Sequence, residues 1–488
     1  MRSSRLSYRT HAWMVASVIA LGAALRFYQL GAQSLWIDEA ATWFRVSLPW
    51  SLLLPSLRNG PNLPTSYALI KLVTDVFGDS EFWLRFPSAF FGTLAIPAAI
   101  GLGRRIGGKA AGLLAGWFWA VHPLAIFYVR DAKTYAITSF LALSLLWLQL
   151  RMKTGERSKR QWAAVYALLL AGLLSHYFFA ILAGLLLLSA LQSLRSDPDF
   201  FRRWALATIL CMLPLLLWVA WFYALEQPML GNGWIDVPTL TDPLLTLWNL
   251  LSGYGGQLSP QTAAFGLVGG LVLVAGLVWG QRRREAWLAL GLALALPMWA
   301  MVLVSWRKPL YMDRYFIVLL PVVTYLVASG GAALWARLRD SLTMDRRRRL
   351  VIGLFAGALL LGAWVGSSVH MQSHYAKEDW RGLAAHLRAV DGQNAELLDG
   401  RLVPLWYYYQ DDYAVADLSC ESGCWEILRR AYMPTHEFTS AIDHTDRPWR
   451  TQPPSTCTVI NEWASPTNLI ARKLVCSIPV DSSTSNGD

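Results

Sequence analysis

The sequence predicts a polytopic α-helical membrane protein of about eleven transmembrane helices with a small extracytoplasmic C-terminal α/β domain. Three observations lead to this prediction. Of 488 residues, 55% are hydrophobic and only 15% are charged, whereas soluble chains carry charge on about a quarter of their residues. Basic residues form short clusters between long apolar runs. From about residue 370 onward the composition becomes that of a soluble domain.

The apolar runs define the predicted spans. A span needs about 20 apolar residues, and eleven segments are candidates: 11–30, 84–103, 110–128, 134–150, 162–176, 178–194, 204–223, 263–280, 286–305, 315–335 and 350–369. The fifth and sixth are short, so we expect the turn between them at Ser175, His176 and Tyr177. Residues 1–369 would then form the membrane domain and residues 370–488 the soluble domain.

The basic clusters predict the orientation, because loops rich in Lys and Arg stay in the cytoplasm. Alternate connections hold these clusters: Arg2/Arg5/Arg9, Arg104/Arg105/Lys109, Arg151/Lys153/Arg157/Lys159/Arg160, Arg195/Arg202/Arg203, Arg282/Arg283/Arg284, and Arg337/Arg339 with Arg346–Arg349. The N-terminus is therefore predicted to be cytoplasmic, and an odd number of spans places the tail outside. Met1–Leu30 could also be a signal peptide cleaved near Ala24, but we favour an uncleaved first span.

The cysteines support an outside tail. Cys211 lies in an apolar span, and four further cysteines lie in the polar tail. An even set in one domain fits disulfides in an oxidising compartment, and zinc is less favoured because paired C-x-x-C knuckles are missing. We predict the pairs Cys420–Cys424 and Cys457–Cys476. The net charge of +11 does not indicate a nucleic-acid binder, because the basic residues separate apolar spans and form no continuous face.

The loops and the tail contain further predicted elements. The first outer loop, residues 31–82, contains apolar stretches at Leu48–Leu57 and Tyr67–Phe77, which are interpreted as interfacial amphipathic helices or packed loop segments. The loop 224–262, rich in Gly and Pro, is either a mobile flap or an irregular connector. In the tail we expect an amphipathic helix at Trp380–Val390. We also expect three strands, at Leu397-Leu398, Cys457–Glu462 and Leu474–Val480.

The candidate chemistry lies at the outer ends of the spans. Asp38 and Glu39 follow the first span directly, and two acids beside a membrane span are costly unless they have a function. Three other groups fall on the same predicted face. They are His122-Pro123 with Tyr128, Arg130, Asp131, Lys133 and Tyr135; His176-Tyr177; and Arg307-Lys308 with Tyr311, Asp313, Arg314 and Tyr315.

A carboxylate on one loop and cations on two others suit the transfer of a group from an anionic leaving group. The carboxylate would deprotonate an attacking hydroxyl, and Arg and Lys would neutralise a departing phosphate. Each group also has a purely structural interpretation. Arg130 and Lys133 could be snorkelling anchors, His176 a buried linker, and Arg314 a partner of Asp313 or Glu39.

At these residues the sequence resembles a known family. The run from Arg26 to Gly31 into Ser34-Leu35-Trp36-Ile37-Asp38-Glu39-Ala40 looks like the opening of polyprenyl-phosphate-sugar-dependent glycosyltransferases of the GT-C fold, which include protein O-mannosyltransferases and the aminoarabinose transferase of lipid A (glycosyltransferase family 39-like). His122-Pro123 through Tyr135 is similar to a second signature, Arg314-Tyr315 before Pro321 to a third, and Lys377–Leu387 to the helix that opens the tail.

This resemblance implies an inverting transfer from a polyprenyl-phosphate donor to an extracytoplasmic hydroxyl of a glycan, lipid or protein. Asp38 would be the base, assisted by Glu39, in a transfer that passes through an oxocarbenium-like state. Arg130, Lys133, Arg314 and Lys308 would hold the donor phosphate, and Tyr135, His176, Tyr311 and Tyr315 would line the substrate site. The location implied is the bacterial cytoplasmic membrane.

Two other classes remain open. A transporter or flippase of lipid-linked glycans would place ionisable groups near the bilayer midplane and repeat its halves, and neither feature occurs in the sequence. A glycan polymerase or ligase shares the cationic outer loops but does not require an Asp-Glu pair after the first span. No cofactor is expected. A divalent metal held by Asp38, Glu39 and His176 is an alternative, although basic residues already supply positive charge.

Overall fold

The computed structural model describes most of the chain. The described residues are 2–58, 62–153, 155, 157–223, 235, 237–253, 260–280, 283–341, 343–371, 377–392, 395–397, 403–409, 414–415, 424–429, 457–464 and 469–476. Within these ranges the chain is helical up to Met371 apart from turns and connections, and the strands follow it.

The first half of the chain forms ten helices among the described residues. They are α1 (Arg2–Phe27), α2 (Ile37–Ser47), α3 (Trp50–Arg58), α4 (Pro64–Phe77), α5 (Glu81–Val121), α6 (Pro123–Val129), α7 (Tyr135–Lys153), α8 (Lys159–Leu173), α9 (Phe179–Leu191) and α10 (Pro198–Tyr223). The turn predicted at Ser175–Tyr177 is confirmed, because it lies between the end of α8 and the start of α9.

The helices continue to Met371. They are α11 (Asp242–Ser252), α12 (Pro260–Trp279), α13 (Arg283–Leu288), the π-helix η1 (Ala289–Ala295), α14 (Leu296–Ser305), the 3-10 helix η2 (Asp313–Leu319), α15 (Leu320–Ser341) and α16 (Met344–Met371). Residues 224–234, 236 and 254–259 of the predicted loop 224–262 lie outside the described residues. The segment 237–253 between them contains α11, which was not predicted from the sequence.

Six helical segments are long and apolar enough to cross a bilayer. They are Arg9–Phe27, Glu81–Val121, Tyr135–Lys153, Pro198–Phe222, Ala286–Ser305 and Asp313–Leu338. Three shorter apolar helices coincide with predicted spans: Phe179–Leu191, Ala263–Trp279 and Leu350–Val365. The prediction of a polytopic helical membrane protein is confirmed at this level, and the count of eleven spans stays a prediction.

Helix α5 contains two of the predicted spans. Its backbone leaves helical geometry at Gly107 and Gly108, and Gly108 has φ +76°, a conformation that residues with a Cβ rarely adopt. The two arms then pack antiparallel. A Cβ on Gly103 would lie 2.4 Å from the carbonyl oxygen of Ala111, so only glycine permits this close approach. The predicted spans 84–103 and 110–128 are therefore the two arms of a helical hairpin.

One predicted span boundary was wrong. The span predicted at 110–128 ends at Val121, because His122 has extended backbone geometry and Pro123 starts the separate helix α6. Proline lacks the N–H that a continuing helix needs and clashes with the preceding turn. The span predicted at 315–335 lies within the apolar segment Asp313–Leu338, whose first residues form the 3-10 helix η2 before α15 begins at Leu320.

The predicted amphipathic helices of the first outer loop are confirmed as α3 and α4. Lys71 of α4 is buried and donates to the carbonyl oxygen of Val46 at 3.0 Å, which links α4 to the end of α2. The sequence analysis did not predict α2 itself. This helix is the element that carries Asp38 and Glu39.

The tail contains a five-stranded sheet and two helices among its described residues. The elements are α17 (Trp380–Asp391), β1 (Glu396–Leu397), α18 (Val403–Tyr409), β2 (Ala414–Val415), β3 (Cys424–Arg429), β4 (Cys457–Ala464) and β5 (Leu469–Cys476). The strand order is β2-β1-β3-β5-β4; β1 pairs in parallel with β2 and β3, and the other pairs are antiparallel. The α17 prediction is confirmed. β5 starts five residues before the predicted strand, whose residues 477–480 lie outside the described part.

The register of the sheet places Cys457 directly opposite Cys476 on neighbouring strands. Cys424 is disulfide-bonded, and Cys420 lies outside the described residues. Cys211 is a free, buried thiol. The two predicted disulfide pairs stay predictions, and the register brings the second pair together.

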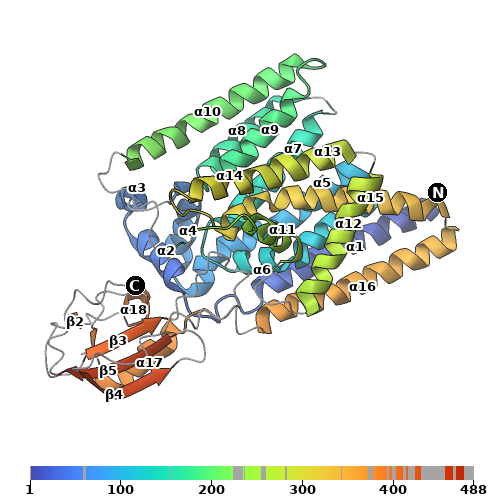
Figure 1. Cartoon of the computed structure of the whole chain (residues 1–488). Helices are drawn as coiled ribbons and strands as arrows, with labels where there is room; N and C mark the ends of the chain where they lie inside the picture. The colour runs from blue at the N-terminus through green and yellow to red at the C-terminus, as the bar shows by residue number, and fades with distance from the viewer. Residues whose placement is uncertain are drawn as a thin grey trace.

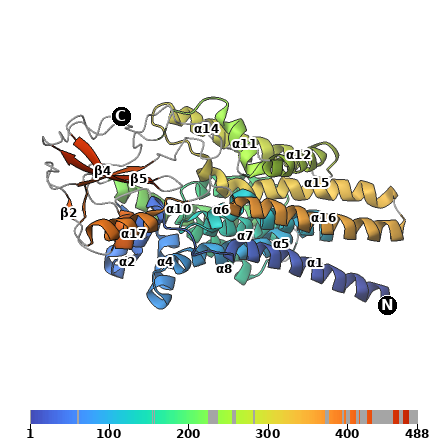
Figure 2. The same cartoon turned by 90° about the horizontal axis from the view of Figure 1, so that it is seen from below.

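The sheet, α17 and α18 lie at one end of the helical bundle, and the N-terminus of α1 lies at the opposite end (Figures 1 and 2). Helix α2 lies at the sheet end. His11 of α1 is within electrostatic range of Arg104 and Lys109, which flank the α5 hairpin turn. Two of the predicted cytoplasmic basic clusters are thus at the end of the bundle away from the sheet.

Candidate functional site

Helix α2 presents its two acidic residues to different surroundings. Both lie in the first helical turn, where the helix dipole stabilises negative charge. The Glu39 carboxylate also accepts the Trp36 backbone N–H at 3.4 Å, which secures the start of the helix. Residues one apart on a helix point in directions about 100° apart. Asp38 is 34% exposed, whereas Glu39 is fully buried.

Asp38 faces cations from two other elements. The Arg314 guanidinium, at the start of η2, lies 3.5 Å from the Asp38 carboxylate. Burial disfavours a charged ammonium, but the Tyr67 hydroxyl and the Asp38 carboxylate nearby raise the pKa of Lys133. Chain segments far apart in sequence therefore meet around one accessible carboxylate. The alternative partner of Arg314 predicted from sequence, Glu39, binds other residues.

Lys133 has a charge without a direct partner. Among the described residues, no carboxylate or hydroxyl oxygen forms a hydrogen bond or ion pair with its ammonium. Arg45 of α2 lies close enough to Lys133 for the two positive charges to repel one another. Among the described residues, the Arg45 guanidinium donates only to the Ala41 carbonyl, at 2.7 Å. Two cations that repel one another favour an anion between or beside them.

Glu39 forms a bidentate ion pair with Arg85 of α5. The Arg85 Nε and Nη2 atoms donate to the two carboxylate oxygens at 2.8 and 2.7 Å. Burial works against the ionised form, but Arg85 and Lys377 hold the pKa of Glu39 far below its usual range. Arg85 also donates to backbone carbonyls of residues 30, 33 and 34. This pair therefore fixes the chain that leads into α2, and both Glu39 oxygens are occupied.

Asp131 and Lys377 complete this buried group. The Lys377 ammonium lies 2.7 Å from Glu39 and 3.3 Å from Asp131. Trp36 donates its indole N–H to Asp131 at 2.8 Å, while the second Asp131 oxygen has no hydrogen-bond partner in the described part of the chain. Burial raises the pKa of Asp131 to about 6, against the opposing effect of Lys377. We call Glu39, Arg85, Asp131 and Lys377 the charge cluster.

An aromatic group lies next to Arg314. The His176 ring is 5.8 Å from the rings of both Tyr135 and Tyr315, measured between centroids. Burial and the charge of Arg314 lower the pKa of His176 to about 4, so the imidazole is neutral at pH 7. Three of the residues predicted to line the substrate site are thus close together and beside the residue that faces Asp38.

Three other predicted site residues lie elsewhere. Arg130 donates to the Tyr28 and Gln29 carbonyls after the end of α1, at 2.6 and 3.2 Å. Tyr311 is fully buried, with its hydroxyl 2.7 Å from that of Thr246 on α11. Lys308 lies in the connection after α14, and no contact found in the described residues joins its ammonium to Asp38.

The alternative metal site predicted from Asp38, Glu39 and His176 is not assembled. Among the described residues, no three His, Cys, Asp or Glu side chains are grouped closely enough to hold a metal ion. Glu39 is occupied by Arg85 and Lys377, and His176 is beside Arg314. A cation next to Arg314 would be repelled, so this donor set does not fit a metal.

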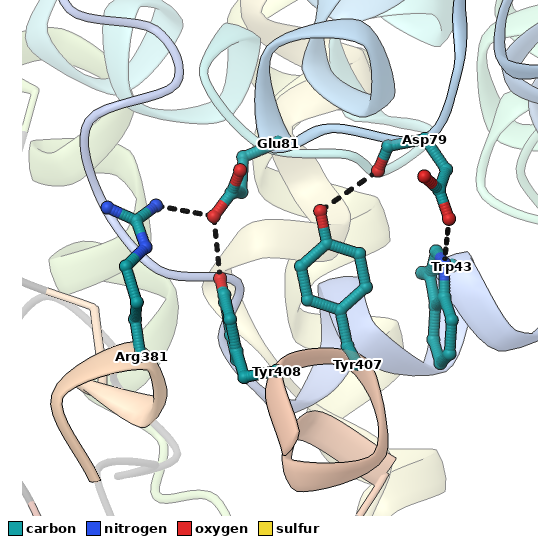
Figure 3. Close-up of a pocket in the computed structure, with 6 residues that line it drawn as sticks. All are labelled: Trp43, Asp79, Glu81, Arg381, Tyr407 and Tyr408. Carbon is teal, nitrogen blue, oxygen red and sulfur yellow. Dashed lines mark hydrogen bonds and ion pairs between the residues drawn. The ribbon is translucent and has the colours of Figure 1, made fainter. Parts of the chain in front are cut away.

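A cavity of about 290 Å³ lies between the tail and the first outer loop. It is lined by Trp43, Asp79, Glu81, Arg381, Tyr407 and Tyr408 (Figure 3). Three contacts cross the cavity between the tail and the bundle: Tyr407 donates to the Asp79 carbonyl at 3.0 Å, Tyr408 donates to Glu81 at 3.1 Å, and Arg381 pairs with Glu81. Trp43 donates to the Asp79 carboxylate at 2.7 Å within the first outer loop. This cavity is therefore part of the contact by which the tail docks on the bundle.

Together the fold and the site define a multi-pass helical membrane protein with an accessible carboxylate and cations at one end, beneath a docked tail. Residues 60–222 match the family model described as dolichyl-phosphate-mannose-protein mannosyltransferase. That match includes Lys133 and His176 but neither Asp38 nor Arg314. No curated protein sequence matches the chain.

Solved structures share the fold. Apo ArnT from Cupriavidus metallidurans is 12% identical, with a TM-score of 0.58 over 95% of this chain and 98% of that chain. ArnT from the same organism bound to undecaprenyl phosphate is 14% identical, with a TM-score of 0.55 and the same coverage. The arabinofuranosyltransferase AftD from Mycobacteria is 16% identical, with a TM-score of 0.52 over 84% of this chain and 32% of that chain. The resemblance to the GT-C glycosyltransferases that use polyprenyl phosphate is confirmed.

Several residues at or behind the site were not assigned a role from the sequence. Arg85 and Lys377 form the charge cluster with Glu39 and Asp131, and Arg45 lies near Lys133. A signal was available for Arg85, which is a single charge at the start of an apolar span. Lys377 begins the segment Lys377–Leu387 that resembles the family, but its binding partners could not be predicted, because they are more than 240 residues away in the chain.

Proposed function

We propose that the protein is an inverting glycosyltransferase that moves a sugar from a polyprenyl-phosphate donor to a hydroxyl group of an extracytoplasmic acceptor. The observation that carries this proposal is the accessible Asp38 carboxylate facing Arg314 and the unpaired Lys133. A base and phosphate-binding cations are the two requirements of this reaction. The family match and the fold shared with ArnT bound to undecaprenyl phosphate support the donor class.

In the proposed reaction, the acceptor oxygen attacks the anomeric carbon from the face opposite the phosphate. Asp38 takes the hydroxyl proton as the new C–O bond forms, and the bond between the anomeric carbon and the phosphate oxygen breaks. The polyprenyl phosphate leaves with its electron pair, and Arg314 and Lys133 stabilise the negative charge that develops on it. Attack from the opposite face inverts the anomeric configuration.

The remaining predicted residues have proposed roles that follow from their positions. Tyr135, His176 and Tyr315 would form an aromatic wall for the sugar beside Arg314. We propose that Glu39 positions Asp38 through the backbone of α2 and does not touch the substrate. Since cations surround Asp38, we also propose that no divalent metal is needed, so that EDTA should leave turnover unchanged.

The test is the pair of variants Asp38→Asn and Lys133→Met. Removing the proton acceptor should lower turnover by about 10²–10⁴, whereas donor binding should persist because cations hold the phosphate. Lys133→Met should weaken both, because a cation meets the phosphate in the ground state and in the transition state. Turnover is measured with a radiolabelled polyprenyl-phosphate sugar in proteoliposomes, and the binding of undecaprenyl phosphate is measured separately.

Exposed Asp199 provides the matched control, since Asp199→Asn makes the same chemical change at the start of α10. It should retain normal turnover and donor binding. Near-normal turnover in a folded Asp38→Asn protein would overturn the assignment of the base and would favour the transporter class.

A further inference from the structure

Lys377 reaches from the start of the tail into the bundle. It lies three residues before α17, and only 8% of its side chain is exposed. Its ammonium meets three acceptors, which are the Glu39 carboxylate at 2.7 Å, the Arg130 carbonyl at 3.1 Å and the Asp131 carboxylate at 3.3 Å. A lysine ammonium has three donors, so this geometry uses each of them.

The charge cluster is electrically balanced only because the tail contributes to it. Glu39 and Asp131 supply two carboxylates, and the bundle supplies a single cation, Arg85. All these side chains are at most 2% exposed. A buried charge without an opposite charge beside it is strongly unfavourable. Removing one partner of a buried ion pair leaves the other partner in that state. The fourth charge that completes the balance is the ammonium of Lys377.

The charge cluster is covalently next to the proposed catalytic groups. Glu39 follows Asp38 in the first turn of α2, and Asp131 precedes Lys133 by two residues. Lys377 therefore joins the two short segments that carry the base and the unpaired phosphate-binding cation. A small displacement of reacting groups lowers the reaction rate and weakens binding. The ion pairs that Lys377 forms with the two segments should therefore affect both the rate and donor binding.

We propose that Lys377 is a positioning residue, which sets the distance between the Asp38 and Lys133 segments by holding Glu39 and Asp131 together, so that the tail is a structural part of the donor site. This inference rests on the proposed function. It assigns the tail a role at the donor site itself, through a charge that the bundle lacks.

The experiment is a double-mutant cycle on the full-length protein in nanodiscs, with undecaprenyl phosphate as the probe. Lys377→Met keeps the length of the side chain and removes its charge. We expect it to weaken probe binding about tenfold near neutral pH. The loss should be smaller in mildly acidic buffer, because loss of Lys377 raises the pKa of Asp131 further and a proton on Asp131 then restores the balance.

The double variant Lys377→Met/Asp131→Asn is the decisive member of the cycle. It removes one charge of each sign, so the cluster is again balanced by Glu39 and Arg85, and binding should return to within about threefold of wild type. Lys377→Arg should also bind the probe better than Lys377→Met. Arg381→Gln is the matched control, because it removes a different ion pair between tail and bundle, in which the Arg381 side chain is 48% exposed.

The outcomes separate this inference from the proposed function. Wild-type protein that fails to bind undecaprenyl phosphate overturns the donor site and the inference with it. If the wild type binds and folded Lys377→Met binds equally well, the inference alone is overturned. If Lys377→Met does not fold, the double variant decides: a folded double variant that still binds poorly contradicts positioning by charge balance, and restored binding supports it.

Discussion

Asp38 and Glu39 are neighbours in the sequence with different electrostatic surroundings. Asp38 is partly exposed and lies 3.5 Å from the Arg314 guanidinium. Glu39 is buried, and its oxygens receive hydrogen bonds from Arg85, from Lys377 and from the Ala132 backbone N–H at 2.9 Å. A half-solvated carboxylate can accept a proton from a substrate. A carboxylate enclosed by cations instead fixes the geometry of its neighbours.

Asp131 carries a prediction about pH. Its folded-state pKa of about 6 is above the value of about 3.9 for an unfolded chain. A carboxyl whose pKa is higher in the folded state stabilises the folded protein. This contribution is fully present when the pH is below the pKa of the unfolded chain, and it is lost as the pH rises through the folded-state pKa. Asp131→Asn removes this dependence. The difference in Tm, variant minus wild type, should therefore become more positive between about pH 4 and pH 7.

The measurement is thermal unfolding of detergent-solubilised protein across that range, with exposed Asp199→Asn as the control. The Tm difference between Asp199→Asn and wild type should change much less with pH than the difference between Asp131→Asn and wild type. A Tm difference for Asp131→Asn that becomes more negative toward neutral pH would show that the folded state prefers the ionised carboxylate, contrary to the prediction.

At the scale of elements, the α5 hairpin determines where several parts of the site lie. Its first arm begins with Glu81 and Arg85, which bind the tail and Glu39 respectively. Its second arm ends beside Arg26 of α1, a buried side chain that donates to the Trp119 and Ala120 carbonyls, both at 2.8 Å. These are terminal carbonyls that a helix leaves without intrahelical partners. One element thus connects the first signature to the second.

The hairpin turn depends on Gly108. Its φ of +76° with ψ of −158° belongs to a region of backbone space that is essentially restricted to glycine. Gly108→Ala should destabilise the fold by about 1–3 kcal/mol, which thermal unfolding would detect. Open space surrounds this position, so the effect should come from backbone strain and not from a steric clash.

Gly184→Ala is the matched control for that prediction. Gly184 lies within α9 and also has no neighbour within 4 Å of an added Cβ. Since alanine is favoured over glycine inside a helix, this variant should be neutral or slightly stabilising. Equal effects of the two substitutions would remove the argument from backbone geometry.

At the scale of the whole molecule, the tail and the membrane body form one contact surface on the site side. It includes the buried ion pairs of Lys377 and more exposed contacts such as the Arg381–Glu81 ion pair and the Tyr407–Asp79 hydrogen bond. Tyr408 adds an acceptor for the Leu35 backbone N–H at 2.6 Å, three residues before Asp38. The tail therefore contacts the chain immediately before the proposed base.

The membrane topology is a property of the whole molecule. We expect a cytoplasmic N-terminus, eleven spans and an extracytoplasmic tail, because the basic clusters alternate and the cysteines lie in the tail. Reporter fusions after Arg284 and after Lys377 should read cytoplasmic and extracytoplasmic respectively. A cytoplasmic signal from the second fusion would place Asp38 on the wrong side of the membrane for the proposed acceptor.

The disulfides provide an independent measurement of the same orientation. Cys424 is oxidised, and Cys457 lies opposite Cys476 in the sheet. Peptide mapping without reduction should recover Cys420–Cys424 and Cys457–Cys476. Four free thiols in protein isolated from membranes would contradict the outside location of the tail, whereas a different pairing would change only the connectivity.

Local properties of the sequence were sufficient for much of this structure. Apolar length located most of the long helices, and α17 followed from its amphipathic pattern. The position of Asp38 followed from a charge beside an apolar span. The break at His122 was missed, because the apolar run continues through α6 and hides the effect of Pro123.

The roles of the charged residues required the tertiary structure. Glu39 and Arg130 carry the same kind of charge as Asp38 and Arg314 and lie in similar sequence surroundings, yet Glu39 is buried against Arg85 while Arg130 binds carbonyls after α1. Burial and Coulomb energy depend on distances between segments that are remote in the chain. Lys377 shows this most clearly, because only folding brings its charge to carboxylates on α2 and after α6.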